Sequence, residues 1–475
     1  MAEQPHIVLI MADHLRRDCL SCYGDQPVRT PHLDALAEES VVFEGAYCAA
    51  PLCGPTRVSM YTGTWPHVHG AVVNAEKGFA HAGPGHRTLY EMLDAGGYTI
   101  THTGVNHCRT DPPIRERVPR ASFDGMGDSW TAYARSRGIE PSNHNVPEVL
   151  PLCIPVLAGD GDHPIVRHFH LPRRARYTQS AEDFMDVWWS RRIVEKIQAL
   201  DPATPHYIEA LFWAPHPPLV VPEPYFSMYP PEAIDLPETV GRWCDGQPAS
   251  LLRQTCGQLG HTITRPEYRE AWSAYFGLVT MVDECIGRVV EALKAKGIWD
   301  DALVVFTQDH GEMLGCHHLF QKHCCYEEAT HLPLLVKPPG GGTGRRSQLT
   351  SAVDYCPTIC DYAALPEPQG IAGRSIRPIV EGADAAWRDA TFLEYSGDTT
   401  RSTPMRAVVA DLGGRRLKYI WTQGDIDELY DLAADPLEQH SLVDSADHQA
   451  ARAALRQRLA QWMQETRDPV APGPA

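Results

Sequence analysis

Residues Ile7-Val8-Leu9-Ile10-Met11-Ala12-Asp13-His14 form a short apolar run that ends in an aspartate and a histidine. An uninterrupted run of this length is typical of a parallel strand that is buried on both faces. Leu303-Val304-Val305-Phe306-Thr307 repeats the pattern, and Asp309-His310 follows it. In open α/β sheets the ligand site lies beyond the carboxyl ends of the strands. The two Asp-His pairs are therefore predicted to meet at one edge of a sheet.

Strand-like and helix-like segments alternate around these two runs. Strand patterns cover residues 98–103, 207–213 and 332–337, and helical patterns cover 31–39, 87–95 and 265–296. Thr30 is a candidate N-cap for the first helix, because Pro31 suits the first helical position. Strand, helix, strand repeated in this way predicts an α/β fold, with a mainly parallel sheet sandwiched by helices.

The chain is predicted to form two parts. Residues 1–370 form the catalytic α/β domain, with an insertion at about 108–180 that is rich in Pro, Arg and Asp and weakly periodic. Residues 371–475 form a smaller subdomain. There, short strand patterns at 391–395, 407–410 and 417–421 precede an amphipathic helix at about 447–466. This succession predicts a small antiparallel sheet with one helix.

The composition narrows the classes of partner. The chain has 475 residues, 42 basic against 60 acidic, for a net charge of −18. This balance argues against nucleic acid, whose binding needs clustered Lys and Arg, but not against a small anion in a local pocket. No apolar run is long enough to span a membrane, and the first residues do not resemble a signal peptide. We therefore expect a cytoplasmic protein with no membrane partner, whose 14 cysteines are free thiols, the Cys19-x-x-Cys22 pair included.

The two Asp-His pairs predict a metal site. Carboxylate oxygens and imidazole nitrogens that converge at strand ends suit a divalent cation. Either pair alone is better explained by aspartates that cap helices and by histidines that lie in the core or on the surface. Both pairs at equivalent strand ends favour a metal.

A second constellation is Cys53-Gly54-Pro55-Thr56-Arg57. A cysteine that opens a helix near an arginine lies in a positive field, which lowers a thiol pKa and attracts anions. Cysteine phosphatases place the arginine six positions after the cysteine, whereas here the separation is four. The alternative is a structural loop with a buried thiol.

Cys53-x-Pro55-x-Arg57 followed by Thr62-Gly63 resembles the signature of type I sulfatases, which belong to the alkaline-phosphatase-like superfamily. Further segments resemble this family in the same order along nearly the whole chain. They are Asp13 with Arg16 and Asp18, Cys22-Tyr23-Gly24, Thr30-Pro31-His32-Leu33-Asp34, Asp309-His310-Gly311-Glu312-Met313-Leu314-Gly315, Lys322 with Tyr326-Glu327-Glu328, Pro333-Leu334-Leu335-Val336, and Leu429-Tyr430-Asp431-Leu432 with Asp435-Pro436 and Glu438.

The resemblance implies a large mixed, mainly parallel sheet and a set of site residues. It implies that Cys53 is converted to Cα-formylglycine, through transient contact with a formylglycine-generating enzyme, and becomes the nucleophile. Asp13, Asp309 and His310 match metal ligands, Cys53 also touches the metal, and His14 occupies the position of a further ligand. Arg57 and Lys322 match residues that bind the anionic group. His107 matches the histidine beside the nucleophile, and His216 matches the one that faces the leaving oxygen.

Two positions depart from the usual family pattern. His14 stands where most sulfatases have a second aspartate, and Val105 stands where most have a sulfate-binding lysine. The family usually holds Ca²⁺, which favours oxygen ligands, whereas Mn²⁺ and Zn²⁺ tolerate nitrogen. We therefore expect one divalent ion, Ca²⁺ or Mn²⁺, with Zn²⁺ as a further candidate. The phosphonate monoester hydrolase branch departs at the same two positions.

The implied activity is hydrolysis of small anionic sulfate esters through a covalent sulfo-enzyme. The first alternative is hydrolysis of phosphonate monoesters or phosphodiesters with the same nucleophile. The second is a non-catalytic metal- and anion-binding homologue whose cysteine is never converted. Asn74 is a candidate substrate-binding residue, with a simple turn residue as an equally good interpretation. Resemblance to the phosphonate hydrolase branch suggests a homo-oligomer, either a dimer or a tetramer.

Overall fold

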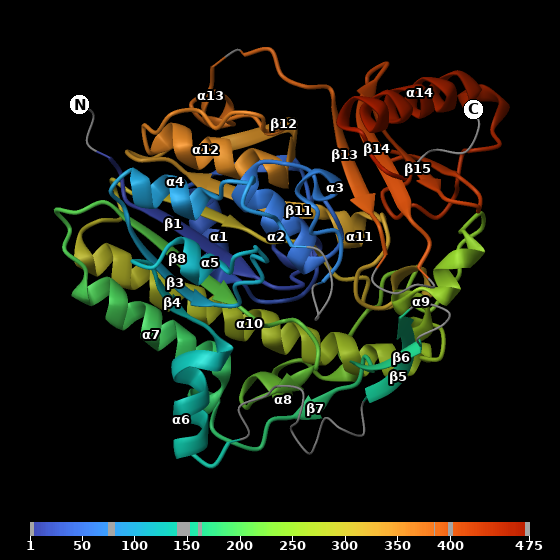
Figure 1. Ribbon diagram of the computed structural model, residues 1–475. Helices are drawn as coiled ribbons and strands as arrows, with labels where there is room; N and C mark the ends of the chain where they lie inside the picture. Colours follow the sequence, from blue (N-terminus) through green and yellow to red (C-terminus); the bar gives the residue numbers. More distant parts are fainter. Residues whose placement is uncertain are drawn as a thin grey trace.

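The computed structural model describes residues 4–74, 81–139, 153–159, 164–383, 385–397 and 402–470. Within these residues the main sheet has eight strands in the order β12-β2-β11-β10-β1-β8-β3-β4 (Figure 1). In that order the strands are Gly344–Ser351, Val41–Tyr47, His331–Lys337, Leu303–Thr307, Ile7–Ala12, His206–Phe212, Thr99–Gly104 and Ser122–Asp124.

The strand β1 lies at the centre of this sheet. It pairs in parallel with β10 on one side and with β8 on the other, and β8, β3 and β4 continue in parallel. In contrast, β11 is antiparallel to both β10 and β2. The sheet is thus mixed and mainly parallel, as predicted. Met11 of β1 lies opposite Thr307 of β10, so the two strands end at the same edge and deliver their Asp-His pairs side by side.

Helices cover both faces of the sheet (Figure 1). On one face α10 packs against α7 and α1, and on the other face α2 packs against α12 and α4. The bounds of these helices are α1 Pro31–Glu38, α2 Cys53–Thr62, α4 Leu89–Ala95, α7 Met185–Ala199, α10 Arg265–Lys296 and α12 Tyr355–Tyr362. All six residues of β1 are buried between the two layers. This explains why the strand is apolar throughout rather than alternating.

The helix predicted at 265–296 is confirmed as α10. Thr264 and Glu267 form a reciprocal capping box at its start, and Gly297 ends it in the left-handed conformation with φ of 76°. Thr30 occupies the N-cap position of α1 and Pro31 is its first residue, as predicted, but the Thr30 side chain forms no capping hydrogen bond. Its hydroxyl donates to Asp34 Oδ1 instead, at 3.2 Å. The carboxylate of Asp283 on α10 accepts from the first N–H groups of α1, so a neighbouring helix supplies the cap.

The remaining elements of the catalytic part are short. Within the predicted insertion, β4 joins the edge of the main sheet, and β5 (Cys153–Gly159) and β6 (Pro164–His170) form a hairpin. Residues 140–152 and 160–163 of that insertion lie outside the described residues. The other short elements are α3 Pro66–His69, α5 Ile114–Arg117, α6 Thr131–Ser136, β7 Ala175–Arg176, β9 Val220–Val221, α8 Tyr225–Met228, α9 Thr255–Gly260, α11 Glu327–Thr330 and α13 Arg377–Val380.

The C-terminal residues form a four-stranded antiparallel sheet within the described part of the chain, ordered β13-β14-β15-β16. Its strands are Ala390–Tyr395, Met405–Leu412, Arg415–Thr422 and Glu428–Asp431, and helix α14 (Gln449–Thr466) packs on β14 and β15. Trp462 of α14 stacks on Phe392 and meets Trp65 of the catalytic part edge-on. The placement of a domain boundary at residue 370 stays a prediction.

Two further observations bear on expectations from the sequence. The thirteen cysteines whose side chains the structure describes are all free, as predicted. Among the described residues, no helix combines the length and the apolar character that crossing a bilayer would need.

A buried ion pair between His67 of α3 and Glu394 of β13 joins the C-terminal sheet to the catalytic part. Glu394 also accepts from the backbone N–H of His67, at 2.6 Å. Burial lowers the pKa of His67, but the hydrogen bond to Glu394 and its charge outweigh burial and raise that pKa above the usual 6.5.

The His67→Gln substitution should therefore destabilise the fold in a pH-dependent way. A histidine with a raised folded pKa contributes stability that is complete below pH 6.5 and is lost as pH rises through the folded pKa. We expect the variant to lose about 1–2 kcal/mol of unfolding free energy near pH 6 and less at pH 8.5. Urea unfolding of both proteins across this range measures the difference. A loss that grows with pH would contradict this assignment.

Candidate active site

Cys53 is the first residue of α2, and its thiol is buried at the edge where β1 and β10 end. Its Sγ lies 3.0 Å from His310 Nε2, 3.3 Å from Lys322 Nζ and 3.9 Å from Asp13 Oδ1. The helix N-terminus adds the partial positive charge of its free N–H groups at the same place. Sequence positions more than 250 residues apart therefore converge on one sulfur atom.

Four buried side chains could hold a metal ion. Asp13, His14, Cys53 and His310 each offer one ligand atom, and these atoms all lie within 4.8 Å of one another. Asp309 lies beside this group, with its Oδ1 3.8 Å from His310 Nε2. The parallel register of β1 and β10 accounts for the arrangement, because both strands end level with each other.

Arg57 bridges the two aspartates from the next turn of α2. Its Nε donates to Asp309 Oδ2 at 2.7 Å and its Nη2 donates to Asp13 Oδ2 at 3.0 Å, and all three side chains are fully buried. Its Nη1 donates to the backbone carbonyl of Val105. The planar guanidinium thus uses a fork of donors to fix both carboxylates.

His14 has a left-handed backbone with φ of 63°, which is uncommon outside glycine. Tyr275 of α10 holds this conformation, because its hydroxyl donates to the His14 carbonyl at 2.5 Å and accepts from the Arg16 N–H. The imidazole Nδ1 lies 2.6 Å from Glu312 Oε2. Burial lowers the pKa of His14 well below its usual value, so the ring is neutral at physiological pH.

The loop that carries His310 and Glu312 is held by a close backbone approach at Gly311. Gly311 and Glu312 donate their N–H groups to the carbonyls of Ala329 and Glu328, both at 2.9 Å. A Cβ at Gly311 would lie 2.0 Å from the Glu328 carbonyl oxygen, so only glycine fits there.

Lys322 lies at the centre of the cluster. Its ammonium group contacts His14 Nε2 as well as the Cys53 sulfur, and it is almost completely buried. Burial lowers the pKa of Lys322, but the nearby Cys53 and Asp13 outweigh this effect and raise it. The site therefore keeps a fixed positive charge next to the candidate nucleophile.

The two other predicted histidines lie on the same side of the sheet. The ring of His216 lies 4.0 Å from that of His14 and 4.0 Å from that of Trp213. His107, whose backbone also has positive φ, lies with its ring 6.4 Å from that of Trp213. Burial and then the Arg57 charge lower the pKa of His107. The structure thus brings His216 to the cluster, and it places His107 edge-on to Trp213 within reach of the Arg57 charge.

Asn74 contacts the first turn of α2. Its Oδ1 accepts from the N–H of Gly54 at 2.8 Å, so it lies next to the candidate nucleophile. Val105, at the position of the usual lysine, offers only its backbone carbonyl, which accepts from Arg57. The structure therefore assigns Arg57 and Lys322 as the two cationic side chains in contact with the cluster.

The charges in this cluster suit a bound cation. Burial and the neighbouring charge of Asp309 raise the pKa of Asp13. Burial also acts to raise the pKa of Asp309, but the charge and hydrogen bond of Arg57, together with the charges of His310 and Lys322, outweigh it and lower that pKa. Burial lowers the pKa of His310 to about 3, so its imidazole is neutral. Two close carboxylates and two neutral imidazoles form a donor set that Mn²⁺ and other divalent transition metals accept. The residues present thus fit a metal ion.

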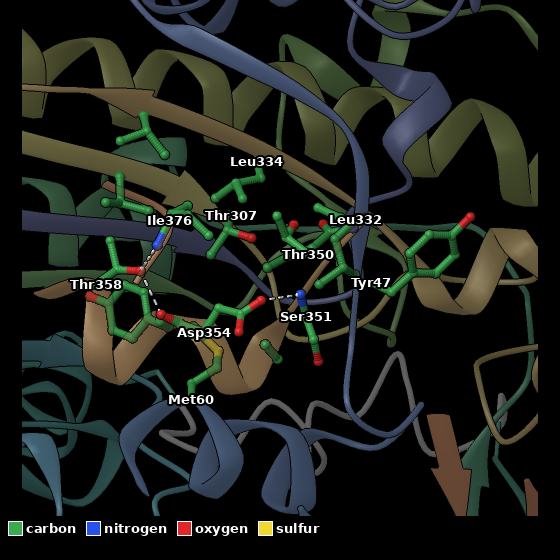
Figure 2. A pocket seen from close by; sticks show the side chains of 16 residues that line it. Tyr47, Met60, Thr307, Leu332, Leu334, Thr350, Ser351, Asp354, Thr358 and Ile376 are labelled. Carbon is green, nitrogen blue, oxygen red and sulfur yellow. Dashed lines mark hydrogen bonds between the residues drawn. The ribbon is translucent and has the colours of Figure 1, made fainter. Parts of the chain in front are cut away.

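A separate enclosed cavity lies between the sheet and α12 (Figure 2). Its volume is about 40 Å³, and residues from β2, β10 and β11 line it together with Asp354 and Thr358. Binding sites for small organic molecules are usually several hundred Å³. This cavity is too small for an ester substrate, and its lining shares no residue with the Cys53 cluster.

A comparison with models of protein families shows which family the chain belongs to. The family model described as Sulfatase matches residues 5–365. The chain belongs to the sulfatase family. The model described as N-sulphoglucosamine sulphohydrolase, C-terminal, matches residues 315–465 of this sulfatase-family chain. The family and many of its relatives are sulfate ester hydrolases, and phosphonate monoester hydrolases are among the structural neighbours, so the chain is an enzyme of the ester-hydrolase class.

Individual relatives cover nearly the whole length of this sulfatase-family enzyme. The arylsulfatase of Clostridium perfringens (strain 13 / Type A) is 28% identical over 96% of this chain and 94% of its own. The multifunctional alkaline phosphatase superfamily protein PehA of Trinickia caryophylli is 27% identical over 96% and 95%. The phosphonate monoester hydrolase of Agrobacterium radiobacter has a similar structure, with a TM-score of 0.76 and 26% identity over 97% and 96% of the two chains.

Sequence reasoning gave no role to three residues that organise the sulfatase-family site. Glu312 stands in the Asp309-His310-Gly311-Glu312 segment, and its place in that segment was the only feature of the sequence that pointed to a role in the site. Tyr275 looked like one more apolar-face residue of α10. Asp186 belongs to none of the sequence motifs described above. In the structure, its buried carboxylate accepts from the N–H groups of Trp213 and Ala214 at 2.6 and 3.2 Å. It thereby anchors the segment that leads to His216.

Substitution of Asp186 by alanine should impair both stability and turnover. It leaves two N–H groups without their acceptor, which costs roughly 2 kcal/mol or more. The Trp213–His216 segment then loses its anchor, and we expect kcat to fall about tenfold or more. Asp186→Asn retains an oxygen acceptor and should keep most of both. Equal losses in the alanine and asparagine variants would contradict a positioning role through this oxygen.

Proposed function

We propose that this sulfatase-family enzyme hydrolyses sulfate esters, with a formylglycine derived from Cys53 as nucleophile and a divalent cation beside it. One observation carries the proposal: Cys53 opens α2 with its sulfur among Asp13, His310 and Lys322. A nucleophile, a cation site and a fixed ammonium group thus share one point at the sheet edge.

The environment of Cys53 disfavours catalysis by the unmodified thiol. Burial, followed by the Asp13 charge, raises the pKa of Cys53 to about 12. The thiol is therefore protonated at neutral pH, and the thiolate is the reactive form. Formylglycine at this position would supply a hydrated aldehyde whose hydroxyl can attack the ester.

The side chains around Cys53 divide the remaining tasks. A bound divalent cation would supply Lewis-acid polarisation of the ester oxygens. Arg57 fixes Asp13 and Asp309 and adds positive charge. Lys322 places its ammonium group against the nucleophile, where it can neutralise charge on the ester oxygens. His216 lies next to His14 on the outer side and can pass a proton to the leaving oxygen, and His107 can take one from the nucleophile.

A second candidate activity is hydrolysis of phosphonate monoesters or phosphodiesters. His14 and Val105 support it, because both positions depart from the usual sulfatase pattern in the way the phosphonate monoester hydrolase branch does. The similarity to the phosphonate monoester hydrolase of Agrobacterium radiobacter supports it as well. Both chemistries transfer a tetrahedral anionic group, so one site can serve either.

Parallel assays on matched aryl substrates distinguish the two activities. The purified enzyme is supplied with one aryl alcohol as a sulfate ester, a phosphonate monoester and a phosphodiester, and kcat/KM is compared. The proposal expects the sulfate ester to be hydrolysed fastest. Sulfate turnover slower than both others would replace it with the alternative. No turnover of any ester, with Cys53 unconverted by mass, would support the non-catalytic homologue.

Further expectations go with this proposal. Modification of Cys53 requires transient contact with a formylglycine-generating enzyme. Assembly as a dimer or tetramer and a cytoplasmic location stay predictions, which sedimentation and fractionation can test.

A further inference from the structure

We propose that Glu312 fixes the tautomer of His14 and thereby makes the site select Mn²⁺ over Ca²⁺. The inference rests on the cation site of the proposed function and adds a positioning residue and a metal preference to it. It concerns Glu312 and His14 of this chain, where most sulfatases carry an aspartate at position 14.

Glu312 has a carboxylate whose orientation is fixed. Its Oε1 accepts from two backbone N–H groups, those of Leu314 at 3.0 Å and Gln321 at 2.5 Å. This leaves Oε2 facing His14 Nδ1 at 2.6 Å, with both side chains fully buried. The pair is therefore a short contact between an oriented carboxylate and one particular nitrogen.

Lys322 supports the same placement of the His14 proton as Glu312. Its ammonium group contacts Nε2, the other ring nitrogen of His14. A lysine ammonium has three donors and no acceptor, so Nε2 must accept and the ring proton must lie on Nδ1. Nδ1 then donates to Glu312, and Nε2 turns its lone pair toward Lys322 and the cluster.

This tautomer makes His14 a nitrogen ligand. Nε2 faces the other candidate ligands, since it lies 3.9 Å from Asp13 Oδ1, and His14 forms a group with Asp13, Cys53 and His310 whose ligand atoms lie within 4.8 Å of one another. A carboxylate behind a ligating histidine is a recurrent arrangement that orients the ring and raises its basicity. Ca²⁺ prefers shells of oxygen, whereas Mn²⁺ accepts imidazole. Two histidines in the set thus favour Mn²⁺.

Glu312→Gln tests the inference. To keep both backbone hydrogen bonds, the glutamine must leave its oxygen where Oε1 was and turn its NH₂ group toward His14. A ring whose Nε2 binds a metal keeps its proton on Nδ1, so this N–H would face the NH₂ group, donor against donor, and ligation would be disfavoured. We expect the Mn²⁺ affinity of the full chain to fall roughly 10–100-fold and the Ca²⁺ affinity to change much less.

Calorimetric titration of the chelator-treated protein with each ion gives both affinities without an activity assay. Glu209→Gln is the matched control, because Glu209 forms a buried pair of the same kind with His102 Nδ1, at 2.5 Å, in the same sheet. It should leave both affinities unchanged. In a His14→Gln background, adding Glu312→Gln should have no further effect on Mn²⁺ binding.

Three results would overturn the inference: tighter binding of Ca²⁺ than Mn²⁺ by the unaltered protein, equal losses for both ions in Glu312→Gln, or the same Mn²⁺ loss in Glu209→Gln. Failure of the proposed function is a separate result. A Mn²⁺-loaded enzyme with converted Cys53 that hydrolyses no ester would refute that function and leave the metal preference intact.

Discussion

Replacement of Cys53 by alanine should abolish ester hydrolysis, with kcat/KM lower by roughly 10⁴-fold or more. The reason is local: the residue opens α2 at the point where the aspartates, histidines and Lys322 converge, and alanine can be neither a nucleophile nor a precursor of one. Serine at this position should be nearly as inactive, because its hydroxyl cannot form the hydrated aldehyde. Steady-state assays of purified variants measure both.

Cys48→Ala provides the matched control for this substitution. Cys48 is also fully buried and lies in the segment just before α2, but it does not belong to the group of described side chains around Cys53 that could hold a metal ion. This variant should retain most of the activity and fold like the unaltered enzyme. A Cys53→Ala enzyme with more than about a tenth of normal kcat/KM would refute covalent catalysis at this residue.

Substitution of Arg57 by methionine should cost both stability and activity. It leaves Asp13 and Asp309 buried without their guanidinium partner, and removal of one member of a buried ion pair typically costs 3–5 kcal/mol. Loss of this positive charge beside the candidate nucleophile should lower kcat/KM by roughly 10²–10³-fold. Arg57→Lys keeps the charge but not the fork, so its losses should be intermediate.

A bound cation should restore part of this stability. Because a ligand that binds only the folded state stabilises it, Mn²⁺ should protect Arg57→Met against urea more than it protects the unaltered enzyme. The control is Arg388→Met, which breaks a largely buried Arg–Asp pair with Asp354, a residue outside both groups of described side chains that could hold a metal ion. It should lower stability without a response to Mn²⁺ and keep normal kcat. An Arg57→Met protein as stable as the unaltered enzyme would contradict this account.

Short-range patterns predicted the centre of the fold. The apolar runs at β1 and β10 needed no other information, because a strand buried on both faces has to be apolar throughout. Strand β12 was missed, because Gly344–Ser351 is an edge strand with few apolar residues. The antiparallel direction of β11 was not predicted either, since the direction of a strand depends on its connections and not on its composition.

The residues of the candidate site also fall into those that the sequence predicted and those that it did not. The Asp-His pairs and Cys53 were predicted from spacing, strand ends and resemblance, and the structure places them together. The roles of Glu312, Tyr275 and Asp186 could not be predicted, because each acts through a contact that depends on tertiary packing. Thr30 illustrates the same limit: the local pattern placed it correctly at the N-cap of α1, but it could not show that Asp283 from another helix supplies the capping hydrogen bonds.

The most direct test of the central claim compares activity with the fraction of Cys53 that has been converted. Preparations made with and without a formylglycine-generating enzyme are digested, and the peptide that contains Cys53 is weighed; conversion to the aldehyde lowers its mass by about 18 Da. A carbonyl reagent identifies the hydrated form. The account predicts specific activity proportional to the converted fraction, with none in unconverted protein. Full activity in a preparation whose Cys53 is entirely thiol would contradict it.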